Sequence, residues 1–176
     1  MNELERLEAM FRARPASLTI EQRRAADDAL GELFPLAVDV RVEQVLAHGV
    51  PAEWMSTPAA STGEVILYLH SGGYVWGSLK SQRHLVSEVG RAAAMRTLTV
   101  DYRRAPEFPF PHALEDAIAL TRAAGLADVS VRLEIWPKMF HIWPTYHQVL
   151  AQGRQGVARA GRLLRDAVEA ASSGEG

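Results

Sequence analysis

The sequence contains no cysteine, which excludes disulfide bonds and thiolate metal sites. No apolar run approaches the roughly 20 residues that a membrane-spanning helix needs, so no membrane span is expected. The formal net charge of −2 gives no electrostatic reason to expect a nucleic acid or an anionic membrane surface as a partner. The first residues mix both signs of charge and do not resemble a signal peptide, so a cytoplasmic location is the default expectation.

The chain does contain enough apolar material for one folded domain. Apolar residues make up 48% of its 176 residues, a share typical of globular proteins with a buried core. Alternating or continuous short apolar runs predict strands, and apolar residues repeating every three to four positions predict helices. The strands are expected near residues 38–45, 52–55, 65–69, 96–100 and 129–135, and the helices near residues 4–14, 19–34, 81–94, 113–124 and 146–170.

Strands that alternate with helices predict an α/β layered fold with a mostly parallel sheet. The first two strands are separated by a short turn and are expected to form a hairpin at a sheet edge. Residues 1–36 are expected to form two N-terminal helices, the second capped by Thr19 and Gln22. These helices either cover a site or pack as ordinary parts of the domain, and ordinary packing is the simpler interpretation. Residues 37–176 are then the main α/β domain.

The segment 64–78 combines a short apolar strand with a glycine turn. Its strand, V-I-L-Y-L at residues 65–69, is typical of a buried parallel strand with both faces covered. Gly72 and Gly73 follow at the carboxyl end, where open α/β sheets bind their ligands. Two backbone N–H groups exposed there can stabilise negative charge that develops on an oxygen atom. A plain strand-to-loop turn is the alternative, and His70 with the aromatic residues after the glycines argues against it.

Three stretches resemble one known family. Residues 70–78, H-S-G-G-Y-V-W-G-S, resemble the His-Gly-Gly-Gly oxyanion motif of the hormone-sensitive-lipase-like (bacterial family IV) carboxylesterases, with Ser71 in place of the first glycine. Residues 101–117, D-Y-R-R-A-P-E-F-P-F-P-H-A-L-E-D-A, resemble that family's D-Y-R-L-A-P-E-x-P-F-P-A-A-x-x-D-A segment. Residues 136–141, W-P-K-M-F-H, are similar to the segment that carries the family's catalytic histidine. The resemblance implies an α/β-hydrolase fold.

The resemblance also implies a reaction, the hydrolysis of small short-acyl esters by a Ser-His-Asp/Glu triad without a cofactor. Gly72 and Gly73 match the positions whose N–H groups form the family's oxyanion hole, within the motif that His70 and Ser71 begin. His141 matches the general base, which takes the proton of the nucleophile while a carboxylate holds the other ring nitrogen.

The family's G-x-S-x-G nucleophile motif does not occur in this sequence. No serine has glycine at both the second position before it and the second position after it. Ser61, for example, has Gly63 after it but Ala59 before it. Ser71 is a weak substitute, because it would have to attack a carbonyl group held by its own neighbouring amides.

The acid of the triad is unknown as well, because the nearby upstream carboxylates belong to the 101–117 segment or to the strand before His141. The sequence is therefore interpreted as a truncated family member that has lost an internal block, with the junction near residues 116–125. In the family that block supplies the nucleophile strand and the acid loop. Its loss leaves an apolar strand edge at residues 65–69. This edge can pair with the strand at 129–135, self-associate with another copy, or cause poor folding.

The other polar clusters of the sequence are weaker evidence for a functional site. The histidines lack the i, i+4 spacing of a helical zinc pair, so no metal is expected. Asp101, Arg103 and Glu107 are expected to form a structural hydrogen-bonded turn. Glu115 and Asp116 lie in the first turns of a helix, where the macrodipole favours acidic side chains.

Two functional hypotheses from different classes follow. The first is a carboxylesterase in which Gly72 and Gly73 hold the oxyanion and His141 is the base. The second is a catalytically inactive remnant that serves as a binding or oligomerising module. The family motifs favour the first hypothesis, and the missing nucleophile favours the second for the activity of this chain.

Overall fold

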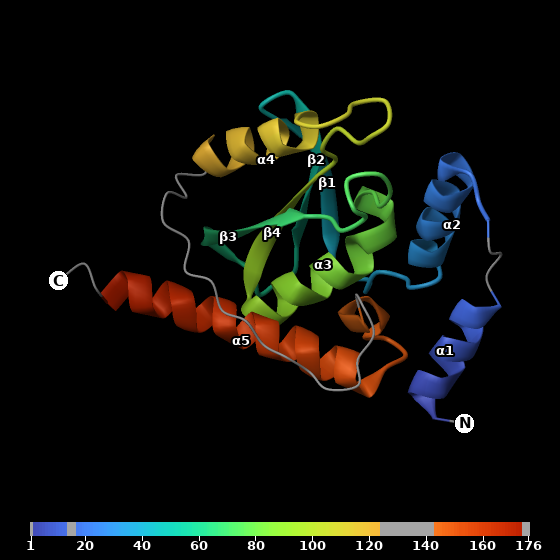
Figure 1. Ribbon diagram of the computed structural model, residues 1–176. Coiled ribbons are helices and arrows are strands. Elements are labelled where there is room, and N and C mark those ends of the chain that lie inside the picture. Colours follow the sequence, from blue (N-terminus) through green and yellow to red (C-terminus); the bar gives the residue numbers. More distant parts are fainter. Residues whose placement is uncertain (1, 14–16, 124–142, 174–176) are drawn as a thin grey trace.

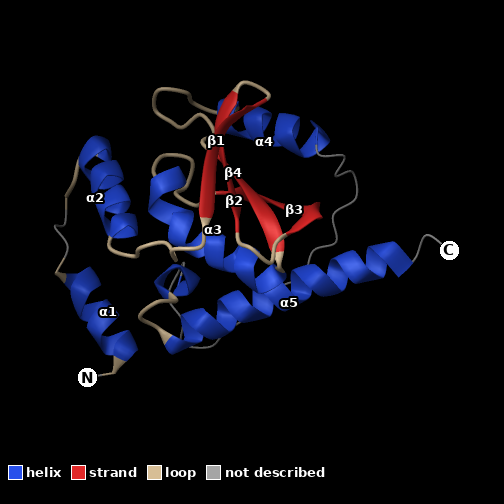
Figure 2. Cartoon of the chain, turned by 180° about the vertical axis from the view of Figure 1, so that it is seen from behind, coloured by secondary structure: helices blue, strands red, loops and turns tan. Residues whose placement is uncertain are grey.

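The structure, a computed structural model, describes residues 2–13, 17–123 and 143–173 (Figure 1). Its elements in chain order are α1 (Glu3–Arg12), α2 (Ile20–Glu32), β1 (Arg41–Ala47), β2 (Val50–Ser56), β3 (Ser61–Leu69), α3 (Leu79–Ala93), β4 (Met95–Val100), α4 (His112–Ala123), the 3-10 helix η1 (Trp143–Tyr146) and α5 (Ala151–Ser173). Helix α4 covers one face of the sheet, α3 covers the other face, and α5 packs against α3 (Figures 1 and 2). The predicted α/β fold is confirmed.

The four described strands form a mixed sheet in the order β1-β2-β4-β3. The β1–β2 and β2–β4 pairs are antiparallel, and the β3–β4 pair is parallel. The predicted hairpin is confirmed, but the prediction of a mostly parallel sheet is wrong for these strands. The reason is that β4 enters the sheet between β3 and the returning strand of the hairpin, which runs the opposite way. The strand predicted at 129–135 lies outside the described residues.

Strand β3 lies at one end of this sheet, with β4 as its neighbour in the described part of the chain. The prediction that both of its faces are covered is wrong, because Val65 is 47% exposed and Leu69 is 42% exposed. A strand at an edge has one side without a partner, and apolar side chains there remain accessible to solvent. In the described part of the chain, β3 therefore has one partner strand and two exposed apolar side chains.

The N-terminal helices pack against the C-terminal part of the chain. Leu7 of α1 is buried in a cluster with Tyr146 and Leu150, and Phe11 and Phe34 pack against the same cluster. This contact removes apolar surface of both chain ends from water, which stabilises the fold.

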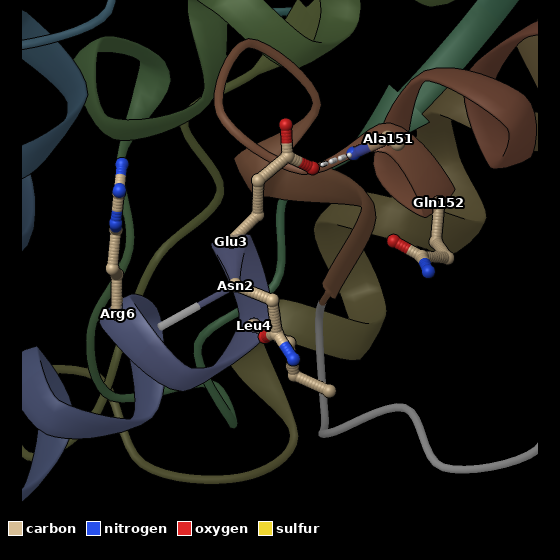
Figure 3. A pocket seen from close by; sticks show the side chains of 6 residues that line it. All are labelled: Asn2, Glu3, Leu4, Arg6, Ala151 and Gln152. Carbon is tan, nitrogen blue, oxygen red and sulfur yellow. Dashed lines mark hydrogen bonds between the residues drawn. The ribbon is translucent and has the colours of Figure 1, made fainter.

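Helix α2 has the predicted capping box. The Thr19 N–H donates to Gln22 Oε1 at 3.0 Å, and the Gln22 N–H donates to Thr19 Oγ1 at 3.2 Å. Figure 3 shows how the start of α1 meets the start of α5: the Glu3 side chain points to the backbone N–H of Ala151, which donates to Glu3 Oε2 at 2.7 Å. The last helix begins at Ala151 rather than near residue 146, because residues 143–146 form the 3-10 turn η1.

Two buried histidines join α3 to the segment around η1. His84 is 1% exposed, and its Nε2 donates to the carbonyl oxygen of Thr145 at 2.9 Å. Its ring lies 4.9 Å from the ring of Phe34 and 5.6 Å from that of His147. Burial lowers the pKa of His84 from 6.5 to about 4, and burial also lowers the pKa of His147. Both side chains are therefore neutral in the folded protein at pH 7.

We expect the free energy of unfolding to fall when the pH is lowered from 7 to 5. Between pH 6.5 and about 4 the unfolded chain binds a proton on His84 that the folded protein does not bind, so the unfolded state gains stability. His84 alone contributes a loss of about 2 kcal/mol at pH 5. Urea unfolding across this range measures the loss. The variant His84→Gln, which keeps a donor for Thr145, should reduce the pH dependence, and an unchanged pH dependence in this variant would contradict the assignment.

Candidate functional site

The loop between β3 and α3 turns sharply at two glycines. Gly72 has a φ of 137° and Gly73 a φ of 59°. The Gly72 carbonyl accepts from the N–H groups of Val75 and Trp76 at 3.1 and 3.0 Å, which closes the turn. A Cβ atom at position 72 would collide with the carbonyl of Trp76, whereas one at position 73 would meet nothing within 4 Å. The turn therefore requires glycine at position 72 for steric reasons.

The N–H groups of these two glycines have no hydrogen-bond acceptor within the described part of the chain. Both residues line a pocket of about 530 Å³. The walls of this pocket, which we call the loop pocket, come from α1, α2, the β3–α3 loop, the start of α3 and η1, with Phe11, Leu30 and Tyr146 as its apolar lining. Two unpaired amide donors in a partly apolar pocket can bind an oxygen atom that carries negative charge.

His70 holds the loop rather than facing the pocket. Its side chain is buried and stacks on the ring of Tyr102, with the ring centroids 4.2 Å apart and the planes 13° apart. The Tyr102 hydroxyl donates to the carbonyl oxygen of His70 at 2.7 Å. Burial lowers the pKa of His70, and its Nε2 lies 3.8 Å from Asp101, too far for a hydrogen bond. His70 is thus a neutral residue that fixes the end of β3.

Arg24 of α2 connects the N-terminal helices to this loop, as the position of α2 beside it in Figure 1 suggests. Its Nε donates to the carbonyl oxygen of Val75 at 2.8 Å, and its Nη2 donates to that of Ala105 at 2.7 Å. Its Nη1 donates to Glu107 at 2.7 Å, and this bond lowers the pKa of Glu107 to about 2. The sequence patterns did not identify Arg24, because its partners are 51 to 83 residues away.

Ser71, the weak candidate nucleophile, faces Gln82. The Gln82 side-chain amide donates to Ser71 Oγ, and the Tyr68 hydroxyl donates to Gln82 Oε1 at 2.8 Å. In the described ranges no histidine nitrogen and no carboxylate oxygen is hydrogen-bonded to Ser71 Oγ. A serine hydroxyl without an adjacent base is a poor nucleophile.

The segment 101–117 is held by an ion pair that no local sequence pattern indicates. Asp116 is 7% exposed and accepts from the Arg103 backbone N–H at 2.9 Å and from Arg103 Nη2 at 2.7 Å. Burial opposes ionisation of Asp116, but the hydrogen bonds from Arg103 outweigh it and the pKa is lowered. The helix-macrodipole explanation of Asp116 is therefore insufficient. The predicted hydrogen-bonded turn of Asp101, Arg103 and Glu107 is wrong. Glu107 bonds Arg24, Arg103 bonds Asp116, and Asp101 lies 3.4 Å from Arg104.

The predicted base, His141, lies outside the described residues. The described chain resumes at Trp143, and Thr145 and Tyr146 line the loop pocket. Of the acidic residues considered as triad partners, Glu107 and Asp116 are paired with arginines. The described residues bring together no group of three His, Asp or Glu side chains that could bind a metal ion. Within the same ranges no helix has both the length and the apolar composition to cross a membrane.

Known esterases resemble part of this chain in sequence and fold. Residues 66–128 match a family model described as alpha/beta hydrolase fold. An acetyl-hydrolase of Streptomyces hygroscopicus is 44% identical over 103 residues, which are 58% of this chain and 34% of that protein. An esterase from the bacterial hormone-sensitive lipase family, known from a crystal structure, matches 72% of this chain and 44% of its own, with 41% identity and a TM-score of 0.65. Over the part that it covers, the chain resembles esterases of the bacterial hormone-sensitive lipase family.

The chain matches less than half the length of these relatives. It spans about a third of the length of the acetyl-hydrolase that it matches, 34%. In one structure of the esterase EstE5, 68% of this chain matches 41% of EstE5 at 39% identity and a TM-score of 0.64. Another structure of EstE5 comes from a crystal soaked with p-nitrophenyl butyrate. The match to it covers 93% of this chain and 98% of EstE5, with 23% identity and a TM-score of 0.81. At this identity the match shows a likeness of fold alone.

Proposed function

We propose that this chain carries the carbonyl-binding half of a carboxylesterase site for small short-acyl esters. The single observation that supports it is that Gly72 and Gly73 line the loop pocket with N–H groups for which the described residues offer no acceptor. In an esterase such donors hold the oxygen of the substrate carbonyl as it becomes negatively charged. Removal of one such donor typically slows acyl transfer about 100- to 1,000-fold, so the pair is a large part of the machinery.

We also propose that an internal block is missing near residues 116–125. Because 68% of this chain corresponds to 41% of EstE5, the chain is about three fifths as long as EstE5. It nevertheless spans 98% of EstE5, so about two fifths of EstE5 falls unmatched inside the span. A block of this kind would include the nucleophile strand, and β3 with its exposed Val65 and Leu69 is the edge beside which that strand would pair.

The proposal assigns His141 as the general base and leaves the nucleophile and the acid unassigned. A base and two oxyanion donors polarise an ester but cannot form an acyl-enzyme without a nucleophile. The chain by itself is therefore proposed to bind esters without hydrolysing them. The second candidate function, an inactive module that self-associates, is supported by the exposed edge of β3.

We expect no covalent labelling by a fluorophosphonate and no hydrolysis of p-nitrophenyl butyrate beyond the rate with free imidazole. The physical reason is that no described serine hydroxyl is hydrogen-bonded to a histidine nitrogen, and no serine of the sequence lies in a G-x-S-x-G motif. A full-length esterase of the family is the positive control, and light scattering on the same sample measures self-association. Stoichiometric labelling, together with turnover that the variant His141→Ala abolishes, would contradict the inactive assignment.

A further inference from the structure

Arg23, the neighbour of Arg24 on α2, lines the loop pocket together with Gly72 and Gly73. Its Nε is buried and has no hydrogen-bond partner among the described residues, and its closest carboxylate oxygen, on Asp27, is 3.5 Å away. The guanidinium carbon lies 5.4 Å from the centre of the Trp76 ring. Arg23 is thus a partly exposed cation, 39% accessible, that is ion-paired with Asp27 and whose buried Nε makes no hydrogen bond with the described residues.

A buried guanidinium N–H without an acceptor lowers the stability of the fold, because the donor has lost its hydrogen bond to water. A guanidinium group has five N–H donors in a planar fork that matches a carboxylate. Contact with the face of a tryptophan stabilises the cation but leaves the edge of the fork available. The neighbouring Arg24, by contrast, has protein acceptors for its guanidinium nitrogens, which donate to Val75, Ala105 and Glu107.

The loop pocket therefore combines three kinds of groups. The Gly72 and Gly73 N–H groups can each donate to one oxygen, and the Arg23 fork can donate to a second oxygen while neutralising its charge. Phe11 and Leu30 offer apolar surface to a short hydrocarbon chain. The carboxylate of Asp27, which is ion-paired with Arg23, also lines the pocket and repels anions, so a ligand with more than one negative charge is disfavoured more strongly than a singly charged one.

We propose that the loop pocket binds small monocarboxylate anions with a short apolar chain, and that Arg23 selects the anion over uncharged ligands of the same shape. This inference rests on the proposed role of Gly72 and Gly73 as oxygen-binding donors. It goes beyond that role because the ligand is the acid anion rather than the ester, and its binding needs no nucleophile. A chain that does not turn over esters can therefore still act as a carboxylate receptor.

The test is a titration of the ¹⁵N-labelled full chain with sodium butyrate and, separately, with butyramide, at constant ionic strength and pH 7. Butyramide has the same shape without the charge. We expect butyrate to shift the amide resonances of Gly72 and Gly73 and to bind at least about tenfold more tightly than butyramide. The variant Arg23→Gln should weaken butyrate binding by about the same factor and leave butyramide binding unchanged. Arg12→Gln, which removes an exposed charge from α1 outside the pocket, should leave both unchanged.

Each other outcome overturns the inference. If butyramide and butyrate shift the two glycines with equal affinity, the oxygen-binding role survives and the selection of an anion by Arg23 is wrong. If neither ligand moves Gly72 or Gly73, both the inference and the proposed role of these glycines are wrong. If Arg12→Gln weakens butyrate binding as much as Arg23→Gln, the effect is a general one of net charge. The comparison of the two ligands on the unmodified chain decides the question even if Arg23→Gln does not fold.

Discussion

Replacing Gly72 with alanine is expected to lower the free energy of unfolding by at least about 3 kcal/mol. The backbone at this position has a φ of 137°, a region that side chains other than glycine rarely adopt. A Cβ atom would also collide with the backbone carbonyl of Trp76 and lie 2.9 Å from the backbone nitrogen of Gly77. Because these neighbours are backbone atoms of the same tight turn, they cannot move aside without opening it.

Gly73→Ala is the matched control for this prediction. Its φ of 59° lies in the left-handed helical region, which costs a residue with a side chain about 1 to 2 kcal/mol, and nothing lies within 4 Å of the added Cβ. Urea unfolding followed by circular dichroism compares the two variants at pH 7. Equal losses in both variants would show that the steric environment of Gly72 has been misassigned.

Replacing Arg83 with methionine is expected to destabilise the fold by about 3 to 5 kcal/mol. Glu53 of β2 is 1% exposed, and the Arg83 side chain of α3 holds both of its carboxylate oxygens, with Nε to Oε2 at 2.7 Å. The hydrogen bonds to Glu53 raise the pKa of Arg83. Without Arg83 a carboxylate would remain buried between the sheet and α3 without a counter-ion, and that penalty is larger than the value of the pair itself.

A second arginine of α3 provides the control for the first. Arg91 also holds a carboxylate with two bonds, to Asp39, but both side chains are about a third exposed, 34% and 39%. Arg91→Met should therefore cost less than about 1 kcal/mol. The double variant Glu53→Gln with Arg83→Met should recover part of the loss, since it removes the buried charge. Chemical denaturation of the four proteins tests this, and equal losses for Arg83→Met and Arg91→Met would contradict it.

Features that depend on neighbours in the chain could be predicted from the sequence. The capping box of Thr19 and Gln22 closes over three residues, and the turn at Gly72 and Gly73 closes over four. The hairpin of β1 and β2 was predictable for the same reason, since His48 and Gly49 make the turn that joins the two strands.

Features that depend on which elements meet could not be predicted in this way. The apolar run of β3 is the pattern of a strand covered on both sides, yet its place at the end of the described sheet exposes Val65 and Leu69. Asp116 fits a helix start equally well with or without a partner, and only the fold brings Arg103 to it. The ion pair of Glu53 and Arg83 joins residues 30 positions apart and has no local signature.

The two glycines after β3 show which features the sequence determines and which the tertiary structure determines. Their place in the family motif, and the absence of a G-x-S-x-G nucleophile, are properties of the sequence itself, because they are identities and spacings of residues along the chain. The tertiary structure decided what surrounds those glycines. Their amides have no acceptor among the described residues, and they line a pocket with α2. Arg24 donates to the loop, whereas the buried Nε of Arg23 makes no hydrogen bond in the described part of the chain. The physical reason is that segments distant in sequence must come together before a side chain can find its partners. Helix α2 and the β3–α3 loop are such segments, since the bond from Arg24 to Val75 joins residues 51 positions apart.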